Sequence, residues 1–280
     1  MSGAETQDTI LHLENVGVTY PGGVEALKPM NLELQKGEVT VLLGRSGAGK
    51  STLLRSMNFL VRPTTGTIKT ADGTELGSAR SIREHRRKTG MVFQQHQLIG
   101  RQTSLTNVLA GRLSRYSTLR SLLPLSSADR IDALSCLDRV GLLEKALQRT
   151  DTLSGGQQQR VGVARALVME PEILLADEPV ASLDPATSHA LLDLLREICR
   201  KDGITLVLSL HQVEYAREFG DRILALSDGV VVFDDDTKAL TDDVLTDIYG
   251  GTSLEEPAEE DEPSEREVQV EGTAELASSA

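Results

Sequence analysis

Apolar and polar positions follow two patterns along this chain. Short apolar runs bounded by turn residues are typical of buried strands, and longer segments carry apolar residues at helical spacing. We expect strands at Val39–Leu43, Thr67–Thr70, Gly90–Gln94, Ile173–Ala176, Ile204–Ser209, Arg222–Leu226 and Val230–Phe233. We expect helices at Lys50–Leu60, after Gly155, after Pro185 and near Thr241–Ile248. Strands that alternate with helices in this way predict an α/β fold.

The first predicted strand changes phase in its middle. Apolar residues alternate with others in Leu11–Leu13 and again in Val16–Tyr20, but the two series are out of phase around Asn15. This segment is therefore either one bent strand or a strand pair, and it ends in the turn Tyr20–Gly23. A tyrosine at a strand end usually packs in the core or at an edge. Stacking of Tyr20 on a nucleotide base becomes the alternative if the glycine-containing segment Gly44–Thr52 farther along the chain binds phosphates.

The stretch Ser104–Gln148 has leucines at helical spacing, contains Pro124, and shows no strand pattern. It predicts a helical insertion into the α/β domain. We place a helical subdomain at about residues 96–168 within a domain of residues 1–250. The apolar positions of this insertion form either a docking surface or a core of its own.

The residues between the predicted strand Val39–Leu43 and the helix after it fit the phosphate-loop pattern G-x-x-x-x-G-K-[ST]. They are Gly44, Arg45, Ser46, Gly47, Ala48, Gly49, Lys50, Ser51 and Thr52. Glycines let the backbone turn tightly, so that its N–H groups converge on phosphate oxygens at a helix N-terminus. Lys50 is expected to reach the β- and γ-phosphates, and the Ser51 hydroxyl is expected to bind Mg²⁺. We therefore expect a nucleoside triphosphate site.

A second glycine-containing turn, Leu153–Gln157, precedes a predicted helix. Ser154 is suited to capping that helix, and a simple N-cap would explain the serine. It would not explain Gly155 and Gly156, which weaken a helix start unless another group approaches the backbone closely. The turn therefore predicts a second anion site.

Polar residues follow several predicted strands. Asp177 and Glu178 come directly after an apolar strand, where an α/β sheet places its ligands. Asp177 suits a Mg²⁺ site beside the phosphate loop, and Glu178 suits the activation of a water for attack on the γ-phosphate. His211 lies just beyond another strand, where it is expected to contact the γ-phosphate rather than to be only structural.

The acidic net charge is concentrated at the end of the chain. The 280 residues carry a net charge of −13, but 251–280 contain ten acidic residues and one basic residue, so that only −4 belongs to residues 1–250. This tail has few large apolar side chains, and we expect it to be disordered. The charge balance gives no support for nucleic-acid binding.

Other features bound the class of protein. Cys136 and Cys199 are too few and too isolated for a disulfide framework or a metal cluster, and we expect both to be buried. Met1–Asp8 lack a signal-peptide pattern, and no apolar run approaches the roughly 18 residues that span a bilayer. We therefore expect a protein that stays in the cytoplasm.

Taken together, these motifs resemble the ATP-binding subunits of ABC transporters, from about Ile10 to Tyr249. The resemblance implies a P-loop NTPase (RecA-like) core sheet with an N-terminal antiparallel β region and an inserted α-helical subdomain. It implies an ATPase that uses ATP and Mg²⁺. It assigns Tyr20 to adenine stacking, Gly44–Thr52 to Walker A, Ser51, Gln94 and Asp177 to the metal, Ser154, Gly155, Gly156 and Gln157 to the signature motif, Asp184 to the D-loop, and Glu178, His211 and Gln94 to catalysis.

The resemblance also implies partners. ATP bound at one Walker A loop would be completed by the signature motif of a second copy, in a homodimer of ATPase subunits. The dimer would bind two transmembrane permease subunits at the cytoplasmic face of the cell membrane, as a peripheral protein. An extracytoplasmic phosphonate-binding protein would deliver the substrate.

Within the family, the phosphonate-import ATPases are the most similar group. The similar segments are Asn58, Arg101–Leu125, Leu153–Leu167 and Leu210–Glu218. Two features depart from that group: Ser209 stands where Asn is expected, and the acidic tail is an addition. Import of phosphate, phosphite, methionine or polar amino acids and export of lipid or peptide are alternatives. A soluble ABC ATPase of DNA repair or translation is another class, disfavoured because a coiled-coil insertion and a second cassette are missing.

Overall fold

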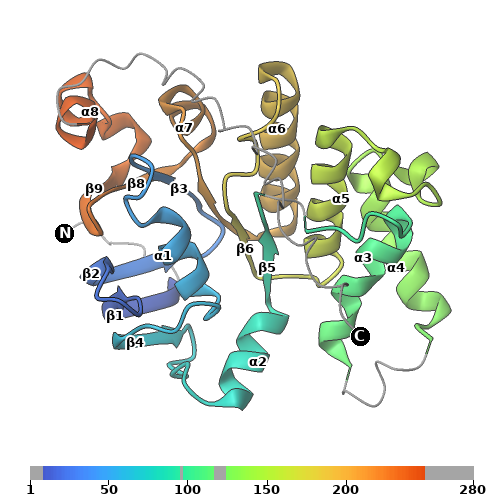
Figure 1. Cartoon of the computed structure of the whole chain (residues 1–280), viewed down its shortest axis with the longest axis horizontal. Helices are drawn as coiled ribbons and strands as arrows, with labels where there is room; N and C mark the ends of the chain where they lie inside the picture. The colour runs from blue at the N-terminus through green and yellow to red at the C-terminus, as the bar shows by residue number, and fades with distance from the viewer. Residues whose placement is uncertain (1–8, 95–96, 117–123, 250–280) are drawn as a thin grey trace, which may run out of the picture.

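The computed structural model describes residues 9–94, 97–116 and 124–249, and two sheets carry the fold (Figure 1). A three-stranded sheet has the order β2-β1-β4, and a six-stranded sheet has the order β5-β6-β7-β3-β8-β9. The expected α/β class with an antiparallel N-terminal region is thereby confirmed. The predicted acidic tail lies outside the described residues.

The six-stranded sheet is parallel except at one edge. Its strands are β3 (Val39–Leu43), β5 (Thr89–Val92), β6 (Ile173–Ala176), β7 (Thr205–Ser209), β8 (Arg222–Ser227) and β9 (Val230–Asp236). β9 pairs antiparallel with β8, whereas the other neighbours are parallel. Every residue of β3, β5, β6 and β7 is buried. Both faces of this sheet are covered, which is why its strands appear in the sequence as continuous apolar runs.

The three-stranded sheet consists of β1 (Thr9–Thr19), β2 (Glu25–Gln35) and β4 (Thr65–Thr70). β1 is one bent strand, since Asn15 has a φ of 52° and the pairing register shifts between Leu13 and Val16. The phase change in the sequence therefore marks a bulge. The sequence reasoning did not find β2, which contains Pro29. β2 lies at the edge of its sheet, where a proline is tolerated.

Helices surround the larger sheet (Figure 1). They are α1 (Lys50–Met57), α2 (Ala79–Arg87), α3 (Ser104–Arg112), α4 (Ser127–Arg139), α5 (Gly155–Leu167), α6 (Pro185–Asp202), α7 (Val213–Phe219) and α8 (Asp242–Tyr249), with short 3₁₀ helices at Leu113–Arg115, Leu143–Lys145, Thr150–Thr152 and Thr237–Ala239. The sequence reasoning did not find α2 or α7. α2 is largely polar and α7 is short, so neither carries a long apolar period.

The helices α3, α4 and α5 form one group on the side of the molecule away from the three-stranded sheet (Figure 1). Arg112 of α3 is almost completely buried, pairs with Asp132 of α4, and lies 3.0 Å from Glu170, which follows α5. These ion pairs hold the group together. The boundaries of a helical subdomain at about 96–168 stay a prediction.

Two apolar cores lie on opposite faces of the six-stranded sheet. Along β3, Val41 and Leu43 belong to the core shared with α5 and α6, and Leu42 belongs to the core shared with the smaller sheet and α1. Cys136 and Cys199 are buried and unpaired, as expected. Within the described ranges, no helix combines the length and the apolar character needed to cross a bilayer.

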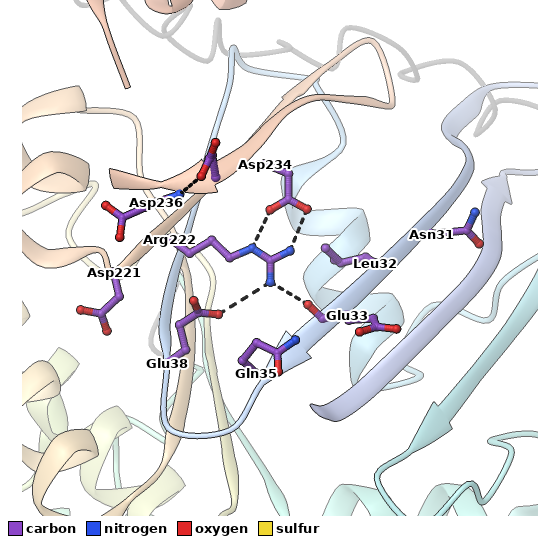
Figure 2. Close-up of a pocket in the computed structure, with 10 residues that line it drawn as sticks. Asn31, Leu32, Glu33, Gln35, Glu38, Asp221, Arg222, Asp234 and Asp236 are labelled. Atoms are coloured by element: carbon purple, nitrogen blue, oxygen red, sulfur yellow. Dashed lines mark hydrogen bonds and ion pairs between the residues drawn. The ribbon is translucent and has the colours of Figure 1, made fainter. Parts of the chain in front are cut away.

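One arginine joins the two sheets. Arg222 of β8 donates two hydrogen bonds to Asp234 of β9, at 2.5 and 2.7 Å, and one to the carbonyl oxygen of Glu33 in β2, at 2.7 Å. Glu38 lies 3.7 Å away, and the four groups face a hollow between the sheets (Figure 2). Burial raises the pKa of Glu38, and the charge of Arg222 opposes that rise.

Replacing Arg222 with Met is expected to lower the free energy of unfolding by about 1–3 kcal/mol. The change keeps most of the apolar stem but leaves Asp234 and Glu38 without their shared cation. Urea unfolding measures the effect. Arg80→Met is the control, because Arg80 is 88% exposed in its ion pair with Glu84 and should contribute less than about 1 kcal/mol. Equal midpoints for both variants would contradict the role of Arg222.

Candidate active site

The predicted phosphate loop connects β3 to α1, as a strand-loop-helix unit should. Gly44 and Gly49 have φ values of 140° and 104°, in a region that other residues rarely adopt. A Cβ atom at Gly44 would lie 2.2 Å from the carbonyl oxygen of Leu226, and one at Gly49 would lie 2.7 Å from that of Ala26. Both glycines are therefore required by the path of the loop and by its neighbours.

Lys50 opens α1, and its side chain turns back into the loop. Its ammonium donates to the carbonyl oxygen of Gly44 at 2.7 Å and to that of Arg45 at 3.1 Å. Lys50 is only 4% exposed, and this burial lowers its pKa, while the carboxylates of Glu178 and Asp177 oppose the shift. The loop therefore presents a desolvated cation within reach of both acidic groups.

Tyr20 follows β1 and lies beside the start of α1. Its hydroxyl is 3.3 Å from the Thr52 hydroxyl oxygen. The aromatic ring is thus held next to the last residue of the phosphate loop, although 31 residues separate the two in the chain. Its stacking on adenine stays a prediction.

Asp177 follows β6 and faces the loop. Its Oδ1 accepts a 2.7 Å hydrogen bond from the Ser51 hydroxyl, and its Oδ2 lies 3.2 Å from Nη2 of Arg55. Asp177 is 2% exposed. Hydroxyl and carboxylate oxygens are the donors that Mg²⁺ prefers, and Ser51 and Asp177 place one of each side by side. The residues present therefore fit the metal that the sequence implies.

Glu178 and His211 form a second pair at the same end of the sheet. His211 Nε2 lies 2.6 Å from Oε1 of Glu178. This hydrogen bond is the main cause that lowers the pKa of Glu178, against the raising effect of burial. The hydrogen bond to His211 thus favours the ionised form of the Glu178 carboxyl group. Its φ of 45° is in the left-handed region, unusual for a residue with a side chain.

Gln94 comes from the neighbouring strand. Val92 of β5 pairs with Ala176 of β6, so Gln94 and Glu178 each follow their paired residue by two positions. The two residues leave adjacent strands at the same level, and Gln94 is exposed. The structure thus places Gln94 at the same edge of the sheet as Glu178. The roles of Gln94 in catalysis and metal binding stay predictions.

The predicted signature residues lie elsewhere. Ser154 caps α5 and forms a capping box with Gln157, as their backbone and side-chain groups exchange bonds of 3.2 and 3.4 Å. A Cβ atom at Gly156 would lie 2.6 Å from Cγ2 of Thr187, whose N–H is capped by Asp184 at the start of α6. The segment therefore packs on α6, and β5 and β6 separate α5 from α1 (Figure 1).

Two residues of the site were missed. Ser209, at the end of β7, bonds to both Asp177 and the backbone of Glu178, and Arg55 pairs with Asp177. In the sequence, Ser209 ends an apolar strand and departs from the phosphonate-import pattern, which has Asn there, but neither feature assigns it a role in the site. Nothing in the pattern of α1 distinguishes Arg55 from a solvent-exposed helix residue.

The chain matches the family described as ABC transporter over residues 27–181. It is 57% identical to the phosphite import ATP-binding protein PxtA of Stutzerimonas stutzeri, a similarity that covers 96% of this chain and 97% of that protein. It is 55% identical to the phosphonates import ATP-binding protein PhnC 3 of Nostoc sp., covering 86% and 92%. A dimeric post-hydrolysis structure of the ATP-binding cassette MJ0796 with ADP and Pi is similar with a TM-score of 0.72 and 37% identity, covering 82% of this chain and 100% of that one.

Proposed function

This chain belongs to the ABC transporter family, and from that premise we propose that it hydrolyses ATP to energise the import of phosphonates across the cytoplasmic membrane. The observation that carries the proposal is that two hydrogen-bonded pairs of side chains lie at the phosphate loop. Ser51 lies 2.7 Å from Asp177, and His211 lies 2.6 Å from Glu178. The first pair suits a metal and the second pair suits proton transfer.

The residues divide the work of phosphoryl transfer. The backbone N–H groups of Gly44–Thr52 would bind the phosphates, and the Lys50 ammonium would neutralise the β- and γ-phosphate oxygens. Ser51 and Asp177 would hold Mg²⁺, which when bound neutralises the same oxygens. Glu178 would accept the proton of the attacking water, while His211 fixes the orientation of its carboxylate.

A second copy of the chain would complete each site. The N-terminus of α5, with Ser154–Gln157, is held against the start of α6, and β5 and β6 lie between α5 and the helix α1 that follows the phosphate loop of the same chain (Figure 1). A helix N-terminus with glycines is suited to an anion, so the γ-phosphate bound by the partner subunit is its natural ligand. The similar cassette MJ0796 has been solved as a dimer, which supports this arrangement.

The remaining partners follow from an importer role. Two permease subunits would hold this chain peripherally at the cytoplasmic face, and an extracytoplasmic binding protein would deliver the phosphonate.

Phosphite is the second candidate substrate. The relative at 57% identity is a phosphite import protein, whereas relatives at 55% and 53% are phosphonate import proteins. Phosphite and simple phosphonates are both small oxyanions of phosphorus. The transported solute would contact other subunits of the transporter. The substrate proposal therefore depends on the similarity of this chain to its relatives and not on a solute-binding pocket.

Growth on defined phosphorus sources tests the substrate. A strain that lacks this gene, and has no second importer, is expected to fail on an alkylphosphonate and to grow on inorganic phosphate. The wild-type gene should restore growth, and the Lys50→Ala gene should not. Failure on phosphite alone would replace phosphonate by phosphite as the substrate. Normal growth of the deletion strain on the alkylphosphonate as well as on phosphite would contradict the substrate proposal.

A further inference from the structure

The end of β7 contacts Glu178 twice. His211 contacts the Glu178 carboxylate, and the Ser209 hydroxyl oxygen accepts a 2.9 Å hydrogen bond from the Glu178 N–H. Sheet pairing of β6 ends just before this point, where the Asp177 N–H donates to the carbonyl oxygen of Val92 in β5. Glu178 then adopts a left-handed backbone conformation. Its N–H is paired not by β5 but by the Ser209 side chain of β7, the neighbour on the other side of β6.

The same hydroxyl also fixes Asp177. The Ser209 hydroxyl donates a hydrogen bond of 3.3 Å to Oδ1 of Asp177, and this oxygen also accepts the 2.7 Å hydrogen bond from Ser51. Ser209 is completely buried and Asp177 is 2% exposed. One buried hydroxyl therefore connects the backbone of Glu178, the carboxylate of Asp177 and, through that carboxylate, the phosphate loop.

We propose that Ser209 is a positioning residue for ATP hydrolysis, acting through Glu178 and Asp177 without touching ATP. This inference rests on the proposed function. Its oxygen holds the backbone of Glu178 in the left-handed conformation that aims the carboxylate at His211. Its proton orients Asp177 Oδ1 toward Ser51. Both effects need an oxygen that accepts one hydrogen bond and donates another, so an apolar side chain of the same size cannot replace it.

The matched pair Ser209→Thr and Ser209→Val tests the hydroxyl at constant shape. Val and Thr are close in shape and differ by a methyl group in place of a hydroxyl, so both add a second branch at Cβ and only Thr keeps the hydroxyl. Thr is expected to retain most of the kcat for ATP, whereas Val and Ser209→Ala are expected to lower kcat by about 10–100-fold, the usual effect of removing a residue that orients a metal ligand. Half-saturation by Mg²⁺ should rise in Val and Ala.

A purely structural hydrogen bond would give a different result. Its loss would lower the melting temperature but leave the kcat of the folded fraction unchanged, so both are measured on each full-length variant. Ser104→Ala is the control, because Ser104 is also completely buried and its hydroxyl donates to the Gln148 carbonyl oxygen at 3.4 Å in the helical group. It is expected to keep the wild-type kcat.

Ser209→Cys adds a test with little change in volume, in case Val and Ala do not fold. Its weaker hydrogen-bonding group is expected to give a kcat between those of wild type and Ala. Equal kcat values for Thr and Val, or a wild-type kcat for Cys, would overturn the inference.

Wild type and Glu178→Gln are assayed in parallel to separate the two proposals. An active wild type with an inactive Glu178→Gln, together with equal Thr and Val rates, would overturn the role of Ser209 alone. A wild-type protein that does not hydrolyse ATP would overturn the proposed function and this inference with it.

Discussion

Replacing Glu178 with Gln is expected to lower steady-state ATP hydrolysis by about 10²–10⁴-fold, the usual contribution of a general base. The amide keeps the shape of the carboxylate and can still hydrogen-bond to His211, but it cannot take a proton from water. ATP binding should persist, because the phosphate loop and the pair Ser51–Asp177 are unchanged. The bound state should therefore accumulate as an ATP-dependent dimer.

The hydrolysis rate and the ATP-dependent dimer, followed by size-exclusion chromatography with Mg²⁺ and ATP, check this prediction. Glu172→Gln is the matched control: it makes the same chemical change just before β6, at the opposite end of that strand. Glu172 is exposed and pairs with Lys88 at 2.9 Å, so its loss should leave the rate unchanged. A Glu178→Gln protein that hydrolyses ATP at the wild-type rate would refute the role of Glu178 as the base.

Replacing Lys50 with Ala is expected to weaken ATP binding by about 10–100-fold, because the charge-assisted hydrogen bonds from the ammonium to the phosphates are lost. Hydrolysis should fall at least as far. Lys50 is 4% exposed and its ammonium bonds to the carbonyl oxygens of Gly44 and Arg45, so Ala removes the cation that the loop holds inside it. Affinity is measured directly, by titration with a fluorescent ATP analogue.

Two controls accompany this variant. Lys201→Ala removes an exposed lysine from the last turn of α6 and should leave affinity unchanged. Thermal unfolding without nucleotide shows whether the loss of the hydrogen bonds to Gly44 and Arg45 has disturbed the fold. Unchanged ATP affinity in a folded Lys50→Ala protein would count against the whole phosphate-site assignment.

The site is assembled at one edge of the six-stranded sheet. The phosphate loop, Asp177 and His211 follow β3, β6 and β7, whose carboxyl ends point the same way because these strands are parallel. Residues from three distant parts of the sequence are thus brought within hydrogen-bond distance of one another. The signature segment begins α5, next to the start of α6, and β5 and β6 lie between α5 and α1 (Figure 1), which is why hydrolysis is proposed to need two copies.

Much of this was determined by the sequence. Buried parallel strands need apolar residues on both faces, so β3, β6 and β7 are visible as continuous apolar runs. The loop Gly44–Ser51 is specified locally, because tight turns and phosphate contacts demand glycine, lysine and serine at fixed spacing. The break of pattern at Asn15 left a bent strand and a strand pair as alternatives, and β1 is the bent strand.

Only the tertiary structure decided the rest. The sequence does not show that β2 pairs at a sheet edge that tolerates Pro29, nor that Arg55 reaches Asp177. Ser209 stood out only as a departure from the phosphonate-import pattern. Its two hydrogen bonds depend on strand order, which places β7 beside β6. Strand neighbours and side-chain hydrogen bonds join residues far apart in the chain, and packing selects them, so no local pattern can specify them.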